Sequence, residues 1–419
     1  MSYTDEYLQY VAAAVSAYQA VCVQEKALSE AGFVKLQENA GWKLKAGGAY
    51  YVTRNGSALI AFRIPKKITT ARILASHVDS PAFKIKNAPE VTVEKSYVKW
   101  NVERYGGAIL STWFDRPLSV AGRVFVANGK KVEERLIDLR RDVCLIPSLA
   151  IHMNRDADKS HDVEIQKELL PLAGTRTDLK LTDIIAKEAG VKPDAIVSHD
   201  LFLYNRQEAR VWGDAQEFLS APRIDDTACA FASLKAIIDT TAPKSLALHV
   251  VFDNEEVGSS SIQGACSTFL RDTIHRIALA LSISEEEELC LLAESFLLSA
   301  DNGHAMHPNY PEKCDVTNRP IMGKGVLLKF AGNQKYTTDA YSAAKVRMLA
   351  KEAKIDLQDY HNHSDIPGGS TLGNLLTRSV GVHAADVGLA QLAMHSAYET
   401  CACSDLEDLF RLSAAFFKD

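Results

Sequence analysis

The hydrophobic and polar positions along the chain follow two periods, one helical and one extended, and together they predict an α/β protein. Apolar residues recur at helical spacing in residues 7–22, 227–238, 259–281 and 339–354. Short apolar runs indicate buried strands at residues 73–75, 246–252, 297–300 and 325–330. Near the start, Asn55-Gly56 separates two apolar runs, which predicts a β-hairpin.

The middle of the chain has a different pattern. From about residue 89 apolar and polar residues alternate, as in half-exposed antiparallel strands, and residues 201–211 resemble one more strand. Regular alternation of strands and helices returns at about residue 221, and a capping box at residues 404–407 predicts the start of a terminal helix. We therefore expect a β-rich second domain over residues 89–217, inserted into a first domain formed by residues 1–88 and 218–419.

Composition narrows the class of protein. The 419 residues are 47% hydrophobic, enough for one large core or for one core and a smaller partner. A net charge of −6 argues against a protein that binds nucleic acids or membrane surfaces. The acidic N-terminus differs from a signal peptide, and no apolar run reaches the ~18 residues of a membrane span. The eight cysteines form no C-x-x-C pair, so we expect a cytoplasmic enzyme without a zinc ribbon.

The strand at residues 246–252 ends abruptly in acidic residues. In an open α/β sheet, ligands bind in the crevice at the carboxyl ends of the strands. Glu255 and Glu256 would repel one another there unless a cation lies close. Successive side chains of an extended chain point in opposite directions, so one carboxylate could bind a metal while the other faces a water. A solvated acidic turn is the alternative.

Other apolar runs also stop at residues that can bind a metal. The complete set is His77, Asp225, Glu255, Glu256, Asp301 and His395. Two imidazoles and several carboxylates suit Zn²⁺, and also Co²⁺ or Mn²⁺. A carboxylate can bridge two ions ~3.5–4 Å apart, as in two-metal hydrolases. The H-E-x-x-H and G-x-S-x-G motifs of other hydrolases are absent, so spacing alone favours a two-metal hydrolase without proving it.

Six segments in order carry a more specific resemblance. They are HVDSP at 77, TWFDRPLSVAGRV at 112, RIDD at 223, DNEEVGS at 253, SADNGHAMHPNY at 299 and LAMHS at 392. Over about residues 50–400 the chain resembles the aspartyl aminopeptidase family of co-catalytic zinc exopeptidases. The resemblance implies a three-layer α/β catalytic domain with a central mixed β-sheet, and an inserted β-rich dimerisation domain.

The resemblance also implies roles for individual residues. One metal ion would be bound by His77, Asp225 and Asp301, and a second by Asp225, Glu256 and His395, with Asp225 as the bridge. Glu255 would be the general base that takes a proton from water, with Asp79 beside His77. His152 matches a histidine that reaches the active site of a neighbouring subunit. Lys329 and Tyr336 would contact the substrate, and His304, which lies close after Asp301 in the sequence, is a further candidate for a substrate contact.

The implied activity is the release of N-terminal residues from peptides, with a preference for Asp and Glu. The implied assembly is a tetrahedral dodecamer built from dimers, without nucleic acid or membrane partners. Lys329 lies in an apolar run, which fits either an edge-strand lysine or a partner for an acidic substrate side chain. A preference for neutral residues, a related deacylase or carboxypeptidase, and a non-catalytic assembly protein remain alternatives, although no ligand is missing.

Three positions depart from the pattern of the family. Asp226 stands where the family commonly has Asn, and Gly368 stands where many members have Cys. The segment that contains His361 and His363 replaces one that usually carries Arg. We expect a polar loop there, and a further metal site is the alternative.

Overall fold

The computed structural model describes residues 2–155, 159 and 162–419. The chain divides into two compact units. The large unit comprises Met1–Asp79, Ala209–Met394 and Glu399–Asp419, and the small unit comprises Ser80–Glu208 and His395–Tyr398. Each unit has its own sheet and its own hydrophobic core.

A nine-stranded mixed sheet forms the centre of the large unit. In spatial order its strands are β1 (Val34–Lys35), β2 (Ala49–Arg54), β3 (Ala58–Arg63), β13 (Leu246–Phe252), β4 (Ala71–His77), β14 (Phe296–Ala300), β18 (His383–Gly388), β16 (Val326–Phe330) and β17 (Leu357–His361). The neighbours β13, β4, β14 and β18 run parallel, whereas β3 and β16 pair antiparallel with the outer members of that group. The hairpin predicted around Asn55-Gly56 is confirmed as β2 and β3.

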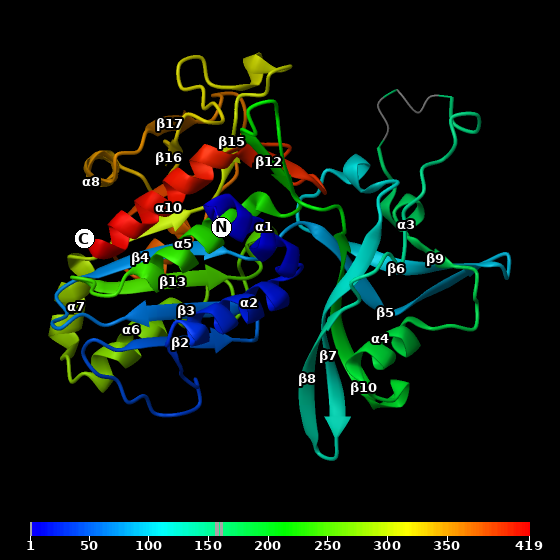
Figure 1. The fold of residues 1–419 in the computed structure, drawn as a ribbon, viewed down its shortest axis with the longest axis horizontal. Helices are drawn as coiled ribbons and strands as arrows, with labels where there is room; N and C mark the ends of the chain where they lie inside the picture. The colour runs from blue at the N-terminus through cyan, green and yellow to red at the C-terminus, as the bar shows by residue number, and fades with distance from the viewer. Residues whose placement is uncertain (1, 156–158, 160–161) are drawn as a thin grey trace. The chain divides into compact units, whose positions relative to one another are not determined.

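Helices cover both faces of this sheet, as Figure 1 shows. One face packs against α1 (Tyr3–Ala13), α2 (Ala17–Glu30), α5 (Ile224–Asp239), α8 (Ala340–Ala353) and α10 (Cys403–Lys418). The other face packs against α6 (Phe269–Ala280), α7 (Glu285–Ala293) and α9 (Gly373–Ser379). The predicted three-layer α/β architecture with a central mixed sheet is therefore confirmed.

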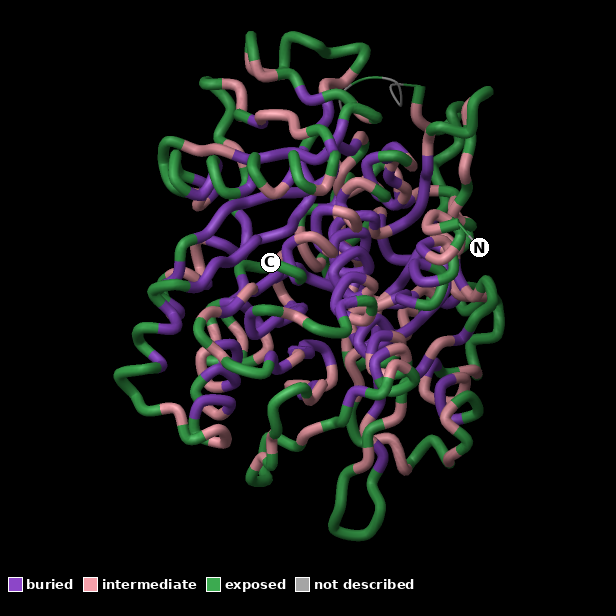
Figure 2. Tube along the Cα trace, turned by 60° about the vertical axis from the view of Figure 1, so that its left-hand side comes forward, coloured by how far each residue is buried: buried purple, intermediate pink, exposed green. Residues whose placement is uncertain are grey.

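The innermost strands are buried on both faces, because helices cover both sides of a parallel sheet (Figure 2). Every residue of β13 is buried, including His249. The ring nitrogens of His249 lie 2.7 Å from Oγ of Ser233 and 2.8 Å from Oε1 of Gln24. The imidazole thus replaces its lost water contacts with two side-chain partners, as a buried polar group requires.

A second sheet of the large unit, with five strands, adjoins the ligand-bearing segments in the sequence. Its strands in spatial order are β11 (Arg210–Trp212), β12 (Phe218–Ala221), β20 (Glu399–Ala402), β19 (Ala390–Leu392) and β15 (Gly303–His304). β12 leads into Asp225, and β15 begins two residues after Asp301. The sheet therefore fixes the backbone on either side of the predicted ligands.

The small unit is a six-stranded antiparallel sheet with short helices. Its strands in spatial order are β8 (Lys131–Asp138), β7 (Leu118–Asn128), β10 (Ile196–Asn205), β5 (Ala82–Val93), β6 (Tyr97–Tyr105) and β9 (Leu172–Gly174), and its helices are α3 (Ile165–Glu168) and α4 (Leu181–Ala189). The unit is β-rich, as the alternating pattern predicts. An inserted domain with the limits 89–217, and its role in dimerisation, stay predictions.

Four local predictions need correction. The stripe over residues 7–22 is split between two helices, and the segment 201–211 between two strands. The helix expected from residue 259 begins only at Phe269, because a turn with a positive φ at Ser259 precedes it. The capping box at residues 404–407 does not form: Asp405 accepts hydrogen bonds from the backbone of Gly323 and Gly325 instead.

No helix of the described residues is long and apolar enough to cross a membrane.

Candidate metal centre

The register of the parallel strands brings three strand ends to one level. His77 ends β4 and pairs with Phe252, which ends β13. In the next pair Ser299 of β14 lies opposite Ala75, so Asp301, two residues further on, follows the same edge of the sheet as His77. This is the carboxyl edge of the parallel strands, where open α/β sheets bind ligands. The predicted ligands therefore collect at this edge because of strand register.

Asp225 reaches this edge from the start of α5. Arg223, with a φ of 61°, turns the chain out of β12, and its guanidinium donates to the carbonyls of Ala14 (3.1 Å) and Val11 (3.0 Å) at the end of α1. The backbone of Asp225 is not helical, and its N–H donates to Oε2 of Glu399 at 3.0 Å. The side chain of Asp225 is thus displayed by an anchored turn before the regular helix begins.

His77, Asp225 and Asp301 form a compact group of ligand atoms. One atom from each lies within 4.8 Å of the others, and all three residues are buried. Nε2 of His77 lies 3.3 Å from Oδ1 of Asp225. An imidazole and two carboxylates at this spacing form a donor set that suits a divalent ion such as Zn²⁺.

Asp79 connects His77 to the two adjacent glutamates. Its Oδ1 accepts from the backbone N–H of Glu255 and its Oδ2 from that of Glu256, both at 3.1 Å. Nδ1 of His77 lies 3.0 Å from the carbonyl oxygen of Asp79 and 3.4 Å from its Oδ1. These contacts occupy Nδ1 and leave Nε2 facing Asp225, the orientation that a metal-binding imidazole needs. One carboxylate therefore sets the positions of both the histidine and the glutamate turn.

The carboxylates of this edge are electrostatically crowded. Burial, with nearby Asp301 and Asp79, raises the pKa of Glu255 to about 8. Burial also raises the pKa of Asp301 to about 6, although Lys329 opposes the shift. The pKa of Asp226 is raised well above its ordinary value by burial and by Asp301 and Asp225. His77 is the exception: burial lowers its pKa, but Asp225 and Asp79 outweigh burial and raise it well above its usual value.

This crowding fits a cation. Buried carboxylates are unfavourable unless a positive charge neutralises them, and a raised carboxylate pKa expresses that cost. Asp226 is completely buried; its Oδ2 accepts from the N–H of His77 at 3.3 Å, and its Oδ1 has no hydrogen-bond partner among the described residues. The residues at this edge therefore have the chemistry of a metal centre.

A buried polar network, which the sequence does not reveal, connects two of the three predicted ligands, Asp225 and Asp301. Nδ2 of Asn302 donates to the carbonyl of Ile224 (3.1 Å) and to Oε1 of Gln391 (3.0 Å). Nε2 of Gln391 donates to Oε1 of Glu399 at 3.4 Å, and Glu399 accepts from Asp225. All of these side chains are buried. The network links the backbone beside Asp301 to the backbone of Asp225. Asn302 and Gln391 lie 89 positions apart in sequence, and Gln391 and Glu399 lie 8 positions apart.

Lys329 lies inside the sheet. β16 has a neighbour on each side, so the edge-strand alternative is wrong. Lys329 is 2% exposed, and its ammonium group donates to the carbonyls of Asp301 (3.0 Å) and Asn302 (2.8 Å). It also lies 4.8 Å from the ring centre of buried Tyr336. Burial lowers the pKa of Lys329, but Asp301 outweighs burial and raises it well above the usual value. A role for Lys329 and Tyr336 toward substrate stays a prediction.

The remaining predicted residues have more exposed positions. His304 is exposed on β15, and Glu256 is partly buried beside Glu255. His395 belongs to the small unit, where its Nδ1 lies 3.2 Å from the carbonyl oxygen of Gly107. His152, also in the small unit, is exposed. The contact of His304 with substrate and the binding of metal by Glu256 and His395 stay predictions. The action of His152 in a neighbouring subunit also stays a prediction. The segment with His361 and His363 lines a pocket of about 260 Å³ that also includes His304.

The fold and this edge define an α/β protein with a buried histidine–carboxylate cluster that could hold a divalent metal ion. Comparisons with known proteins are more specific. Residues 10–417 match the family model "Aminopeptidase I zinc metalloprotease (M18)". A probable M18 family aminopeptidase 2 of Clostridium novyi is 38% identical over 416 residues, which cover 97% of this chain and 96% of that protein.

Solved structures agree with this match. A chain of the cryo-EM structure of the Ape4 and Nbr1 complex has a TM-score of 0.95 at 33% identity, covering 99% of this chain and 85% of that chain. A chain of the mApe1 dodecamer from S. cerevisiae has a TM-score of 0.87 at 26% identity. The match covers 99% of this chain and 96% of that chain. The chain belongs to the M18 family of zinc aminopeptidases, which confirms the resemblance read from its motifs. It is a metallo-aminopeptidase of that family, a hydrolase whose cofactor is a divalent metal.

Proposed function

We propose that this chain is a two-zinc aminopeptidase that removes acidic residues from the N-termini of peptides. The observation that carries the proposal is the group formed by His77, Asp225 and Asp301, with Glu255 in electrostatic contact with all three. For the second ion we retain the ligands Asp225, Glu256 and His395 expected from the sequence, with Asp225 shared between the ions. Cobalt or manganese would suit the same donors.

The roles of the protein residues follow from their positions. Bound zinc would polarise the scissile carbonyl and make a water molecule more acidic. Glu255 accepts the proton of the attacking water and returns it to the nitrogen of the leaving amine. The carboxylate of Asp79 accepts a hydrogen bond from the backbone N–H of Glu255 and so keeps Glu255 in place.

The preference for acidic residues rests on the positive charge beside the site. Lys329, Tyr336 and His304 are the proposed substrate residues. The ammonium group of Lys329 has three donors, and two of them bond the carbonyls of Asp301 and Asn302. The third is directed toward the acidic side chain of the substrate in this proposal. Rates for peptides that begin with Asp, Glu, Leu or Lys test it, and equal turnover of Asp- and Leu-initiated peptides would contradict it.

We further propose a homo-oligomer, a tetrahedral dodecamer built from dimers. Support comes from mApe1 of S. cerevisiae, whose structure is a dodecamer. His152, exposed on the small unit, would act in the active site of a neighbouring subunit. Mixing dissociated His152→Ala and Glu255→Gln subunits and reassembling them should restore part of the activity. Mixed oligomers of verified composition that stay inactive would argue against action in trans.

One assay tests the proposed function directly. Amino-acid release is measured from peptides with free or acetylated N-termini, with and without a chelator. The aminopeptidase is expected to cleave only free N-termini, and the chelator is expected to stop it. Removal of the acetyl group would indicate a deacylase, release from the C-terminus a carboxypeptidase, and no metal-dependent cleavage of any peptide an assembly protein.

A further inference from the structure

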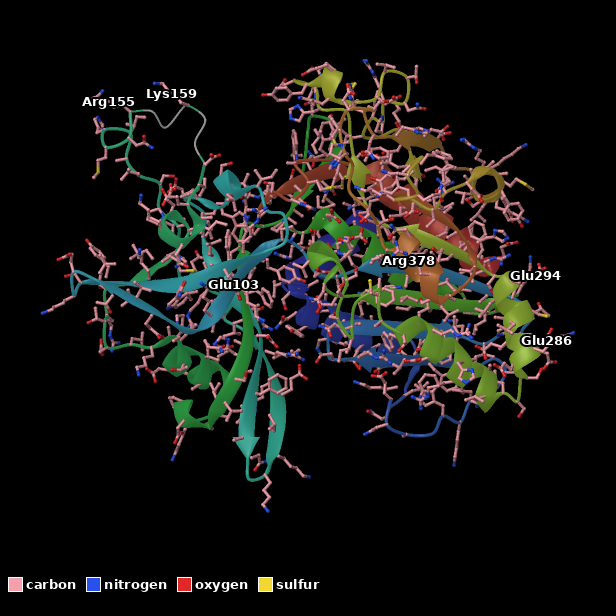
Figure 3. The ribbon with its side chains drawn as sticks, turned by 180° about the vertical axis from the view of Figure 1, so that it is seen from behind. Glu103, Arg155, Lys159, Glu286, Glu294 and Arg378 are labelled. Carbon is pink, nitrogen blue, oxygen red and sulfur yellow. The ribbon has the colours of Figure 1, made fainter. Side chains whose placement is uncertain are left out.

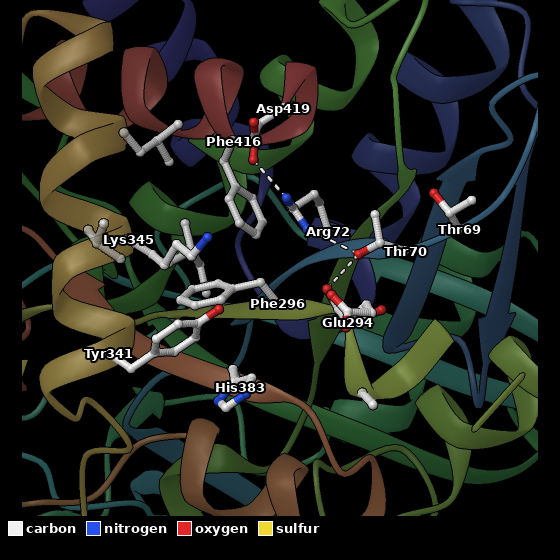
Figure 4. Close-up of a pocket in the computed structure, with 15 residues that line it drawn as sticks. Thr69, Thr70, Arg72, Glu294, Phe296, Tyr341, Lys345, His383, Phe416 and Asp419 are labelled. Atoms are coloured by element: carbon white, nitrogen blue, oxygen red, sulfur yellow. Dashed lines mark hydrogen bonds and ion pairs between the residues drawn. The ribbon is translucent and has the colours of Figure 1, made fainter. Parts of the chain in front are cut away.

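A pocket of about 400 Å³ lies at the opposite edge of the large sheet, where three of the parallel strands begin (Figure 4). Arg72 of β4, Phe296 of β14 and His383 of β18 line it. Phe296 starts the five-residue strand β14, and Asp301 follows the end of that strand. At a rise of roughly 3.3 Å per residue, the pocket is about 16 Å from the metal centre. It is therefore a separate site.

The floor of this pocket is apolar and aromatic. Phe296, Leu298 and Phe416 are buried and line it, together with Val346 and Leu349 of α8. In Figure 4 the ring of Phe416 descends from α10 toward the space that the rings of Phe296 and Tyr341 border from below. Tyr341 is 51% exposed and forms part of the mouth. A volume of this size with an aromatic floor suits a small molecule that carries a ring.

The rim carries both signs of charge, but only one pair is matched. Arg72 bonds the side chain of Asp419 at 2.7 Å and also donates to Oγ1 of Thr70 at 3.2 Å. Lys345 and Glu294, both exposed lining residues, have no ion-pair partner among the described residues. Lys345 lies 5.6 Å from the ring centre of Tyr341. The rim thus offers an ammonium and a carboxylate, neither of them in an ion pair among the described residues, beside an aromatic floor.

We propose that this pocket binds a free α-amino acid with an aromatic side chain. The α-carboxylate would pair with Lys345, the α-ammonium with Glu294, and the ring would pack against Phe296 and Phe416. Only a molecule with both charges and a ring satisfies all three features. A simple aromatic acid leaves Glu294 unpaired, and an aromatic amine leaves Lys345 unpaired. The proposal concerns binding at this edge and does not depend on the metal chemistry.

The test is calorimetric titration of the full-length protein with L-phenylalanine, 3-phenylpropionate and phenethylamine. Saturable binding of L-phenylalanine is expected, with each single-charge analogue bound about tenfold more weakly, the effect of one lost charge-assisted contact. Lys345→Gln and Glu294→Gln should each weaken the binding of L-phenylalanine by a similar factor. The matched controls are Lys351→Gln on α8 and Glu286→Gln on α7, exposed residues outside the pocket. Glu286 and Glu294 are labelled in Figure 3.

Two results would overturn the proposal. One is the absence of saturable L-phenylalanine binding up to about 10 mM, a range that covers even weak sites. The other is binding that both Lys345→Gln and Glu294→Gln leave unchanged, which would place the amino acid elsewhere, for example at the metal centre.

Discussion

The two edges of the large sheet treat charge in opposite ways. At the carboxyl edge Asp225, Asp226 and Asp301 are buried together around His77. At the amino edge, Arg72 and Asp419 are paired where Asp419 is accessible to water. Water and a paired guanidinium stabilise the second arrangement without help, whereas buried carboxylates raise one another's pKa and need a cation. The difference supports the proposal that the carboxyl edge holds a metal ion.

Removing Asp225, the carboxylate that we propose is shared by two ions, should break this contrast most severely. Asp225→Ala is expected to lose both metal ions and nearly all peptidase activity. This effect should exceed the ~10–100-fold loss of metal affinity that is typical when a residue hydrogen-bonded to a ligand is replaced. Metal content by mass spectrometry and peptide turnover measure the effect. Asp239→Ala, an exposed residue at the other end of α5, is the matched control and should change neither. Two ions still stoichiometric in Asp225→Ala would contradict the bridging role.

The two adjacent glutamates should separate chemistry from metal binding. Glu255→Gln is expected to keep the metal ions and to reduce kcat by ~10²–10⁴-fold, the usual contribution of general acid–base catalysis. Glu256→Gln, one residue away, should lower metal affinity first. Metal titrations and kcat measured on both variants decide the matter. If Glu255→Gln is the variant that releases metal, the two roles are exchanged.

The buried network should matter less than the ligands and more than an ordinary hydrogen bond. Gln391→Leu breaks the link between Asn302 and Glu399 and is expected to weaken metal affinity ~10–100-fold. Gln358→Leu removes a comparable amide, whose Nε2 donates to the carbonyls of Ile321 and Gly325, and should leave metal affinity unchanged. Equal metal dissociation constants for the two variants would show that the network only stabilises the fold.

The smallest expected effect concerns an ionisable group between the two edges. Burial lowers the pKa of His249 to about 3, so the unfolded chain, with an ordinary histidine pKa, binds more protons below about pH 6.5. Stability is therefore lost as the pH falls through this window, by about 2 kcal/mol between pH 7 and pH 5. In urea unfolding, the free energy of unfolding of His249→Gln should fall less between pH 7 and pH 5 than that of the unmodified protein, by this amount. Exposed His383→Gln is the control, and an unchanged dependence in His249→Gln would refute the assignment.

The sequence predicted the strands and the candidate site residues that follow them, because a buried apolar run that stops at His77, Glu255 or Asp301 is a local signal. It did not predict contacts between distant segments. Asp405 has the pattern of a helix cap, yet it bonds the backbone of Gly323 and Gly325. Glu399 gives little signal, because its partner Asp225 lies 174 positions away. An isolated acid in a short apolar strand was the one available hint.

Crystals of the zinc-loaded protein would test the central claim most directly, by anomalous scattering measured on both sides of the zinc absorption edge. Our account predicts a zinc peak bounded by His77, Asp225 and Asp301, and a second peak that shares Asp225. Zinc peaks located only elsewhere, with no anomalous signal between His77, Asp225 and Asp301, would contradict it.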